Sequence, residues 1–289
     1  MNILVLGSNG MLGSDLVSRL GSTYEVTGKD IDDFDITSTG DCHELIAESH
    51  ADIVINAAAY TNVDGCEDHE EECFAVNAEG VKNVARACRT LGSKLIHFST
   101  DYVFDGSKRT SYAEDDPFNP LNAYGRSKLQ GEQYLRECSD NYILIRTAWL
   151  YGKNGKNFVD TIIARAKIDK SLKVVDDQIG SPTYTVDLAA AVEHLIYGNH
   201  RGTFHVTNRG HCSWYEFAKK IIAYSGLSDI DIEPVSTERF PRKAQRPHYS
   251  VLSCKKFSEI TKKAMRFWQV ALKDYLNRLD HMTVRASLN

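Results

Sequence analysis

Short apolar runs alternate with longer segments of helical periodicity through the first half of the chain. The runs at residues 3–6, 24–27, 53–55, 94–98 and 142–145 contain many apolar residues and few polar interruptions. Segments between them, such as 11–20, 70–91 and 124–138, place apolar residues at helical spacing. Strands with so little alternation are typical of a parallel sheet that helices cover on both faces. The sequence therefore predicts an α/β fold with a doubly wound parallel sheet.

A glycine-rich turn directly follows the first expected strand. Gly7, Gly10 and Gly13 have the spacing G-x-x-G-x-x-G and lead into a helix expected to begin near Met11. Glycines let the backbone turn sharply and approach a pyrophosphate, and the free N–H groups of a helix N-terminus point at that anion. Between a first strand and a helix, this motif predicts a Rossmann-type dinucleotide site.

An acidic side chain follows the second expected strand. Asp30 lies at about the distance from the glycine turn where a carboxylate meets the ribose hydroxyl groups of the adenosine. Because a carboxylate there repels a 2′-phosphate, it slightly favours NADH over NADPH. Lys29 beside it, and Asp32, Asp33 and Asp35 after it, leave the preference open, since these charges also fit a solvated loop.

The regular alternation of expected strands and helices ends beyond Tyr151. Helices are expected at residues 158–168, 186–197, 214–225 and 267–279, with irregular turns between them. We interpret residues 1–150 as a dinucleotide-binding Rossmann domain and residues 151–289 as mainly a smaller, mixed α/β substrate-binding domain. No flexible linker marks the boundary, which leaves open whether the two parts interleave. The tail from about Thr283 is expected to fray.

Tyr124 and Lys128 lie four residues apart in a segment expected to begin a helix. At that spacing both side chains project from one helix face toward the same cleft. A free phenol has a pKa of about 10, and a neighbouring ammonium group is expected to lower that pKa toward the range useful for proton transfer. The pair follows a strand that ends in Ser99 and Thr100, and a hydroxyl group at that strand end would hydrogen-bond a carbonyl oxygen that is being reduced. Together with the glycine turn, these residues predict a ketone-reducing site.

Charge and cysteine content exclude several classes of protein. Acidic residues number 39 against 34 basic ones, a formal net charge of −5, so a nucleic-acid partner is not expected. The seven cysteines are scattered without a C-x-x-C pair, which favours reduced thiols in the cytoplasm over a disulfide framework or a zinc site. No segment approaches the ~18 consecutive apolar residues of a membrane span. We expect a cytoplasmic protein with a small-molecule substrate and no membrane partner, and the sequence leaves open whether it forms a homodimer.

Four segments together resemble the extended short-chain dehydrogenase/reductase superfamily and, within it, the dTDP-4-dehydrorhamnose reductase family. They are residues 7–13, 56–59, 99–106 and 124–128. Similarity continues through residues 146–152, 177–183 and 246–247, so it covers nearly the whole chain. The resemblance implies hydride transfer from NADH or NADPH to C4 of the nucleotide sugar dTDP-4-dehydro-6-deoxy-L-mannose, which gives dTDP-L-rhamnose.

The resemblance also implies a role for each matching residue. Tyr124 would donate the proton, Lys128 would assist it and hold the nicotinamide ribose, and Thr100 would polarise the ketone. The deoxysugar would lie against Thr100, Asp101 and Trp149. The cofactor would contact the residues Gly10, Met11, Leu12, Asp30, Asp35, Ile36, Ala58, Ala59 and Tyr60.

This chain departs from the family pattern at two places near the glycine turn. Met11 stands where the family often has Gln, which is expected to change a pyrophosphate contact without abolishing it. Some members bridge a dimer with a magnesium ion held by glutamates near the first helix. Because Asp15 stands at the nearest matching place, no metal site is predicted here.

A basic loop near the C-terminal third has two interpretations. Arg239, Arg242, Lys243 and Arg246 surround two prolines. Such a loop could clamp the diphosphate of a sugar nucleotide, which makes Arg246 a candidate substrate-binding residue. A solvated surface loop explains the same charges equally well.

Other activities of the superfamily remain as alternatives. A 4,6-dehydratase usually follows Thr-Asp with Glu, and Tyr102 at that place supplies no carboxylate, so dehydration is not expected. A related nucleotide-sugar epimerase is not excluded by the sequence. Neither is a non-catalytic, nucleotide-binding regulatory subunit, although Thr100, Tyr124 and Lys128 together favour an enzyme.

Overall fold

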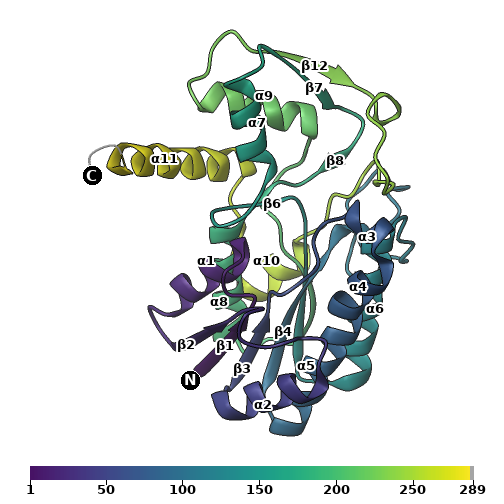
Figure 1. The fold of residues 1–289 in the computed structure, drawn as a ribbon, viewed down its shortest axis with the longest axis vertical. Coiled ribbons are helices and arrows are strands. Elements are labelled where there is room, and N and C mark those ends of the chain that lie inside the picture. Colours follow the sequence, from purple (N-terminus) through teal and green to yellow (C-terminus); the bar gives the residue numbers. More distant parts are fainter. Residues whose placement is uncertain (287–289) are drawn as a thin grey trace.

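A six-stranded parallel sheet forms the centre of the computed structural model, which describes residues 1–286 (Figure 1). The strand order is β10-β5-β4-β3-β1-β2, and every neighbouring pair is parallel. This arrangement confirms the predicted α/β fold with a doubly wound sheet. The strands are β1 (Asn2–Leu6), β2 (Glu25–Lys29), β3 (Ile53–Asn56), β4 (Lys94–Thr100), β5 (Tyr142–Thr147) and β10 (Gly202–His205).

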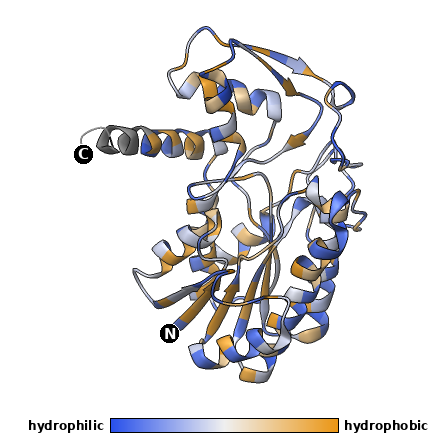
Figure 2. Cartoon of the chain, viewed as in Figure 1, coloured by the Kyte–Doolittle hydropathy of each residue, from blue (hydrophilic) through white to orange (hydrophobic). Residues whose placement is uncertain are grey.

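Both faces of the central strands β1, β3, β4 and β5 are buried, because successive strand residues point to opposite faces and both sets are largely apolar. In β1, Ile3 and Val5 pack on one face, while Leu4 and Leu6 pack on the other. The first face carries α1 (Met11–Leu20), α8 (Thr185–Tyr197) and α10 (Lys255–Thr261). The second carries α2 (Thr39–Ser49), α5 (Gly80–Leu91) and α6 (Ala123–Cys138). Figure 2 shows the hydrophobic residues concentrated along these strands.

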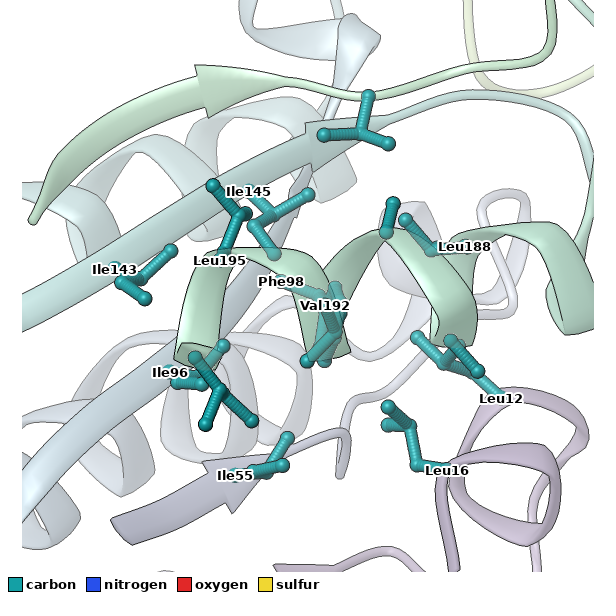
Figure 3. Packing of buried hydrophobic residues seen from close by; sticks show 14 of the residues in the cluster. Leu12, Leu16, Ile55, Ile96, Phe98, Ile143, Ile145, Leu188, Val192 and Leu195 are labelled. Atoms are coloured by element: carbon teal, nitrogen blue, oxygen red, sulfur yellow. The ribbon is translucent and has the colours of Figure 1, made fainter. Parts of the chain in front are cut away.

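Three elements from the second half of the chain belong to the sheet and its covering layer. Strand β10 pairs with β5 at the sheet edge, and α10 packs beside β10. On α8, Leu188, Val192 and Leu195 face Ile143 and the neighbouring strand residues (Figure 3). The chain therefore crosses between the two parts several times after residue 150.

The remaining elements form a smaller second lobe above the carboxyl ends of the strands (Figure 1). Its helices are α7 (Phe158–Ala166), α9 (Trp214–Tyr224) and α11 (Trp268–Ala286), which share one apolar core. Its short strand pairs are β6 (Leu150–Tyr151) with β9 (Thr183–Tyr184), β8 (Ile179–Gly180) with β11 (Cys212–Ser213), and β7 (Ser171–Val175) with β12 (Asp231–Val235). Helix α11 runs past Thr283, where fraying was expected, and residues 287–289 of that tail lie outside the described residues.

The helical segment expected at residues 70–91 is interrupted by a π-helical turn. It consists of α4 (Glu70–Phe74), a π-helix (Ala75–Glu79) and α5, and the short helix α3 (Gly65–Asp68) precedes it. Such turns occur mostly as single insertions in α-helices, frequently at functional sites. Here the turn points the side chain of Asn77 inward, where it is buried.

The seven cysteines are all free thiols, and none forms a disulfide. Within residues 1–286, no helix has the length and hydrophobicity needed to cross a bilayer.

The packing of α8 predicts that Leu195→Ala destabilises the whole sheet domain. Leu195 is fully buried against the strands, so its truncation is expected to lower the free energy of unfolding by about 2–5 kcal/mol. Tyr197→Ala on the same helix is the control, because Tyr197 is 87% exposed and its loss is expected to change that free energy by less than about 0.5 kcal/mol. Urea unfolding followed by circular dichroism measures both, and equal effects would contradict this packing.

Candidate active site

A cleft of about 740 Å³ lies at the carboxyl ends of the central strands. Its floor comes from residues 10–13, 56–59, 98–102 and 147–151, which follow or end β1, β3, β4 and β5. Residues 154–158, Trp214 and Phe217 line it from the second lobe. In doubly wound sheets, ligands bind at this edge, where the loops after the strands diverge. The cleft is therefore the candidate active site.

The glycine turn leaves no room for side chains at two of its three glycines. Gly7 has a φ of +77°, and a Cβ atom there would lie 2.7 Å from the backbone nitrogen of Ala58. A Cβ atom at Gly13 would lie 2.0 Å from the Gly7 carbonyl oxygen. Gly10 is less crowded, because a Cβ atom there would lie 3.4 Å from the Gly7 carbonyl oxygen. The turn is thus packed tightly against β3 and presents bare backbone to the cleft.

Helix α1 begins at this turn without a side-chain cap, because its N-cap residue is Gly10. Its first N–H groups are therefore available to an anion at the positive end of the helix dipole. Asp30, directly after β2, accepts a hydrogen bond of 2.7 Å from the Asn9 N–H through Oδ2. Asp30 thus holds the turn in place, and these residues fit the pyrophosphate and ribose of a dinucleotide.

Tyr124 and Lys128 lie in the first two turns of α6, and both line the cleft. The helix begins where the Asn122 side chain accepts a hydrogen bond of 2.8 Å from the Gly125 N–H. Asn122 in turn donates 2.7 Å to the carbonyl oxygen of Gln245 in the second lobe. The cap therefore fixes both the start of the helix and its contact with the other lobe.

The pKa of the Tyr124 phenol is raised, not lowered as the sequence suggested. Burial is the main cause, the nearby Asp101 carboxyl adds to it, and the Thr100 side chain acts in the opposite direction. The expected lowering was wrong for this state of the site because the low-dielectric surroundings disfavour the charged phenolate more than any neighbour favours it. Tyr124 is consequently a neutral phenol at physiological pH, which is the form that donates a proton.

Lys128 is buried, and burial lowers the pKa of its ammonium group to about 8. Negative charge on Glu132 and on Cys73 acts in the opposite direction. The lysine is therefore poised close to its titration point in the physiological range.

Thr100 ends β4, Asp101 directly follows it, and both are buried and line the cleft. The Thr100 hydroxyl accepts a hydrogen bond of 3.1 Å from the Tyr102 N–H and donates one of 3.1 Å to Asp101 Oδ1. Burial raises the pKa of the Asp101 carboxyl to about 7, against the effect of hydrogen bonds from Ser250 and Thr100.

Five cleft-lining side chains keep a buried polar atom without a hydrogen-bond partner among the described residues. These atoms are Nδ2 of Asn56, Oγ of Ser99, Oδ2 of Asp101, Oγ1 of Thr147 and the hydroxyl oxygen of Tyr151. Buried polar atoms in folded proteins are nearly always paired, so such a group needs an explanation. A polar ligand with hydroxyl groups, bound in the cleft, would supply the missing partners.

Trp149 forms an aromatic wall on the second-lobe side of the cleft. It has a φ of +48°, which is uncommon for a bulky side chain. Its ring stacks on Trp214 with centroids 3.4 Å apart, and Phe158 packs against Trp214 in turn. A Cβ atom at Gly180 would lie 2.4 Å from the Trp149 ring, so the glycine makes room for the indole.

The π-helical turn ties the loop after β3 to α6. Asn77 accepts a hydrogen bond from the Tyr60 N–H (2.9 Å) and donates to the Tyr60 carbonyl oxygen (3.0 Å) and to the Ser127 hydroxyl (3.1 Å). The Tyr60 and Tyr124 rings both pack against the small buried cluster of Cys66, Cys73 and Ala123. One buried amide thus sets the distance between the β3 loop and the helix that carries Tyr124.

The basic loop of the second lobe pairs with acidic side chains at the two ends of α3. Arg246 Nη1 lies 2.6 Å from Asp64 Oδ1, Arg242 lies 3.8 Å from the same carboxylate, and Lys243 pairs with Asp68. Arg246 also approaches the Tyr102 hydroxyl group. These ion pairs connect the two lobes beside the cleft. The sequence analysis considered a diphosphate clamp or a solvated loop and did not include this role.

Most of the predicted site residues line the cleft: Gly10, Met11, Leu12, Gly13, Ala58, Ala59, Thr100, Asp101, Tyr124, Lys128 and Trp149. Outside its lining lie Gly7, Asp30, Asp35, Ile36, Tyr60 and Arg246. Of these, Asp35 accepts hydrogen bonds from Thr37, and Ile36 packs near Gly80 on α5.

Sequence reasoning missed Thr147, Lys156 and Trp214, which also line the cleft. Thr147 had a usable signal, since it ends the strand next to Thr100 and pairs with it in register. Lys156 lies in a loop that packs on the glycine turn, where a Cβ atom at Gly155 would lie 2.6 Å from the Met11 side chain. No local pattern marks that contact.

Known proteins share this sequence and fold over nearly the whole chain. Residues 1–281 match the family described as RmlD substrate binding domain. The spore coat polysaccharide biosynthesis protein SpsK of Bacillus subtilis is 41% identical over 95% of this chain and 96% of its own length. A dTDP-4-dehydrorhamnose reductase structure from Clostridium acetobutylicum is 43% identical, with a TM-score of 0.94, over 97% of this chain and 100% of that one. Another, from Bacillus anthracis in complex with NADP, is 40% identical with a TM-score of 0.93, over 96% and 99%.

The tight glycine turn predicts that Gly13→Ala weakens dinucleotide binding at least about tenfold, equivalent to about 1.4 kcal/mol. The added methyl group would overlap the Gly7 carbonyl oxygen and open the turn. Gly40→Ala in α2 is the matched control, because its nearest neighbour, Ser38 Oγ, is 3.9 Å away. Titration of NADPH fluorescence measures both Kd values. An unchanged Kd for Gly13→Ala would show that the dinucleotide binds elsewhere.

Proposed function

The chain belongs to the family of the RmlD substrate binding domain, and we propose that it reduces the C4 ketone of dTDP-4-dehydro-6-deoxy-L-mannose to give dTDP-L-rhamnose, with NADH or NADPH as cofactor. The relatives named dTDP-4-dehydrorhamnose reductase support this substrate and an oxidoreductase activity. The observation that carries the proposal is the meeting of Thr100, Tyr124 and Lys128 with the glycine turn in one cleft.

The glycine turn and the N-terminus of α1 would hold the pyrophosphate, and Asp30 would reach the adenosine ribose as it braces the turn. When bound, the reduced dinucleotide supplies the hydride. Lys128 would hold the nicotinamide ribose from α6. The relative from Bacillus anthracis is in complex with NADP, which supports NADPH as a cofactor for this chain as well. For this chain, the slight preference for NADH stays a prediction.

Tyr124 would donate its hydroxyl proton to the ketone oxygen while C4 gains the hydride. Because the pKa of the half-buried Tyr124 phenol is raised, the phenol is neutral and its proton is present when the alkoxide develops. The phenolate left behind would be stabilised by the Lys128 ammonium group on the same helix face. Thr100 would turn its single hydroxyl proton from Asp101 Oδ1 to the same oxygen and help orient it between the two hydroxyl groups.

The remaining cleft residues would orient the sugar. Asp101 offers an unpaired oxygen at the bottom of the cleft, which suits a sugar hydroxyl group. Trp149 would pack its indole against the deoxysugar, supported from behind by Trp214. Both contacts hold the ring without adding a second catalytic acid or base.

Elimination of water is disfavoured by the residue after Asp101. Tyr102 stands there, its ring meets Tyr124 edge to face with centroids 6.1 Å apart, and burial raises the pKa of its phenol. Its hydroxyl faces Arg246 instead of supplying a carboxylate to the cleft. A cytoplasmic location and a homodimer stay predictions for this reductase.

Tyr124→Phe is expected to lower turnover of the dTDP-4-keto-6-deoxysugar by about 10²-fold or more, since general acids contribute about 10²–10⁴. The Kd for NADPH is expected to stay within about twofold, because the ring remains. Tyr134→Phe, which removes a hydroxyl from the exposed side of the same helix near Glu79, is the control and is expected to keep full activity.

Absorbance at 340 nm follows turnover, and fluorescence follows binding. Full activity in Tyr124→Phe would remove Tyr124 from the mechanism. Binding of NADPH without turnover in the wild-type chain would favour a regulatory subunit over a reductase.

A further inference from the structure

Glu132 and Arg146 form an ion pair that is completely buried beside the cleft. Arg146 donates from Nε to Glu132 Oε1 (2.8 Å) and from Nη2 to Oε2 (2.7 Å), so the pairing is bidentate. Arg136 on α6 reaches the same carboxylate from the outside, with its side chain 31% exposed. The Glu132 carboxylate is thus held ionised from two sides, and its pKa is lowered despite the burial.

The Arg146 guanidinium also contacts a backbone carbonyl group, a histidine ring and two phenylalanine rings. Its Nη1 donates to the Glu114 carbonyl oxygen (2.9 Å) and lies 3.1 Å from His205 Nε2. The guanidinium lies over the rings of Phe104 and Phe118, at 5.4 and 4.6 Å. Since arginine only donates, His205 must accept at Nε2, and burial together with Arg146 lowers the pKa of His205 to about 3. Among the residues that the structure describes, Glu132 is the one carboxylate that pairs with the Arg146 guanidinium.

Stability alone does not explain such a pair. Removing two charges from water is costly, and apolar side chains of similar volume often serve as well or better. The position of the pair is more informative. Glu132 lies one helical turn beyond Lys128, and Arg146 on β5 pairs in register with Ser99, the residue before Thr100. The carboxylate also faces the Ser99 hydroxyl group.

Lys128 needs a negative neighbour to stay charged. Burial lowers the pKa of its ammonium group to about 8, and without an opposing charge that pKa would fall further. The titratable groups that face it are Glu132 on its own helix and, from the elements packed against that helix, Cys73 of α4 and His97 of β4. His97 is neutral because burial lowers its pKa, and it contributes no negative charge.

We propose that Glu132, locked by Arg146, is a positioning residue for the reduction: it keeps Lys128 cationic beside Tyr124 and holds the end of β4 in place. This inference rests on the proposed function, because it assigns Glu132 a task in that reaction. Glu132 touches neither the substrate nor the cofactor site and acts through Lys128. Arg146 supplies the fixed charge that keeps the carboxylate ionised inside the protein.

The test compares Glu132→Gln with Arg136→Gln. Loss of the carboxylate is expected to shift the alkaline limb of the kcat profile about one pH unit lower, because two charges one helical turn apart interact by at least that much in a buried site. The KM for the keto sugar is expected to stay within about twofold. Arg136→Gln leaves the Glu132–Arg146 pair intact, so its profile is expected to match the wild type.

A second readout needs no turnover. The NMR chemical shift of the Lys128 ¹³Cε atom is followed as a function of pH in protein that carries ¹³C-labelled lysine. The signal is assigned as the one that is absent from Lys128→Met. A lower Lys128 pKa in Glu132→Gln than in the wild type supports the proposal. An unchanged Lys128 pKa overturns it, as does a kcat that falls equally at every pH. If the wild type shows no turnover, the proposed function fails, and this titration still decides the electrostatic role of Glu132.

Folding is controlled with a double variant, because Glu132→Gln leaves Arg146 buried without an anion. Glu132→Gln combined with Arg146→Met removes both charges together. If only the double variant folds, its Lys128 titration decides: a lowered pKa supports the proposal and an unchanged one overturns it. Failure of both variants to fold would mean that the pair serves the fold alone, which also overturns the proposal.

Discussion

The burial of both faces of the parallel sheet is the constraint on which the rest of the structure depends. Helices α1, α8 and α10 cover one face and α2, α5 and α6 the other, so polar chemistry is confined to the strand ends. At the carboxyl edge, the glycine turn, Asn56, Thr100 and Thr147 come from four neighbouring strands and line one cleft. A cofactor and a substrate that must react with each other are expected to meet at this edge.

Burial also sets the charge states that the proposed reaction needs. Tyr124 is kept neutral and able to donate, Asp101 is brought close to neutrality, and Lys128 is brought near its titration point. The same low-dielectric surroundings make the Glu132 carboxylate effective, since water would screen it at the surface. The ionised groups therefore follow one another from the buried Arg146 through Glu132 to Lys128. The neutral phenol of Tyr124 faces the cleft.

The dinucleotide turn and the pair of side chains on α6 could be predicted from the sequence because each depends on a local spacing. The turn at residues 7–13 and the Tyr124–Lys128 pair have fixed offsets whose geometry follows from the backbone alone. Helix α2 was missed because it buries little apolar surface, mainly Cys42 and Ile46. Strand β10 was missed because it is only four residues long and begins with glycine. The pairing of Arg246 with Asp64, 182 residues apart, depends on how the lobes close, and no spacing rule reveals it.

The central claim is that one cleft brings the reduced dinucleotide and the keto sugar together so that hydride passes to C4. It is tested most directly with NADPH that carries deuterium at the transferable position, using the wild-type chain and dTDP-4-dehydro-6-deoxy-L-mannose. Proton NMR and mass spectrometry of the product are expected to find one deuterium on C4 of dTDP-L-rhamnose for each dinucleotide oxidised. Recovery of the unreduced sugar, or of product without deuterium at C4, would contradict the claim.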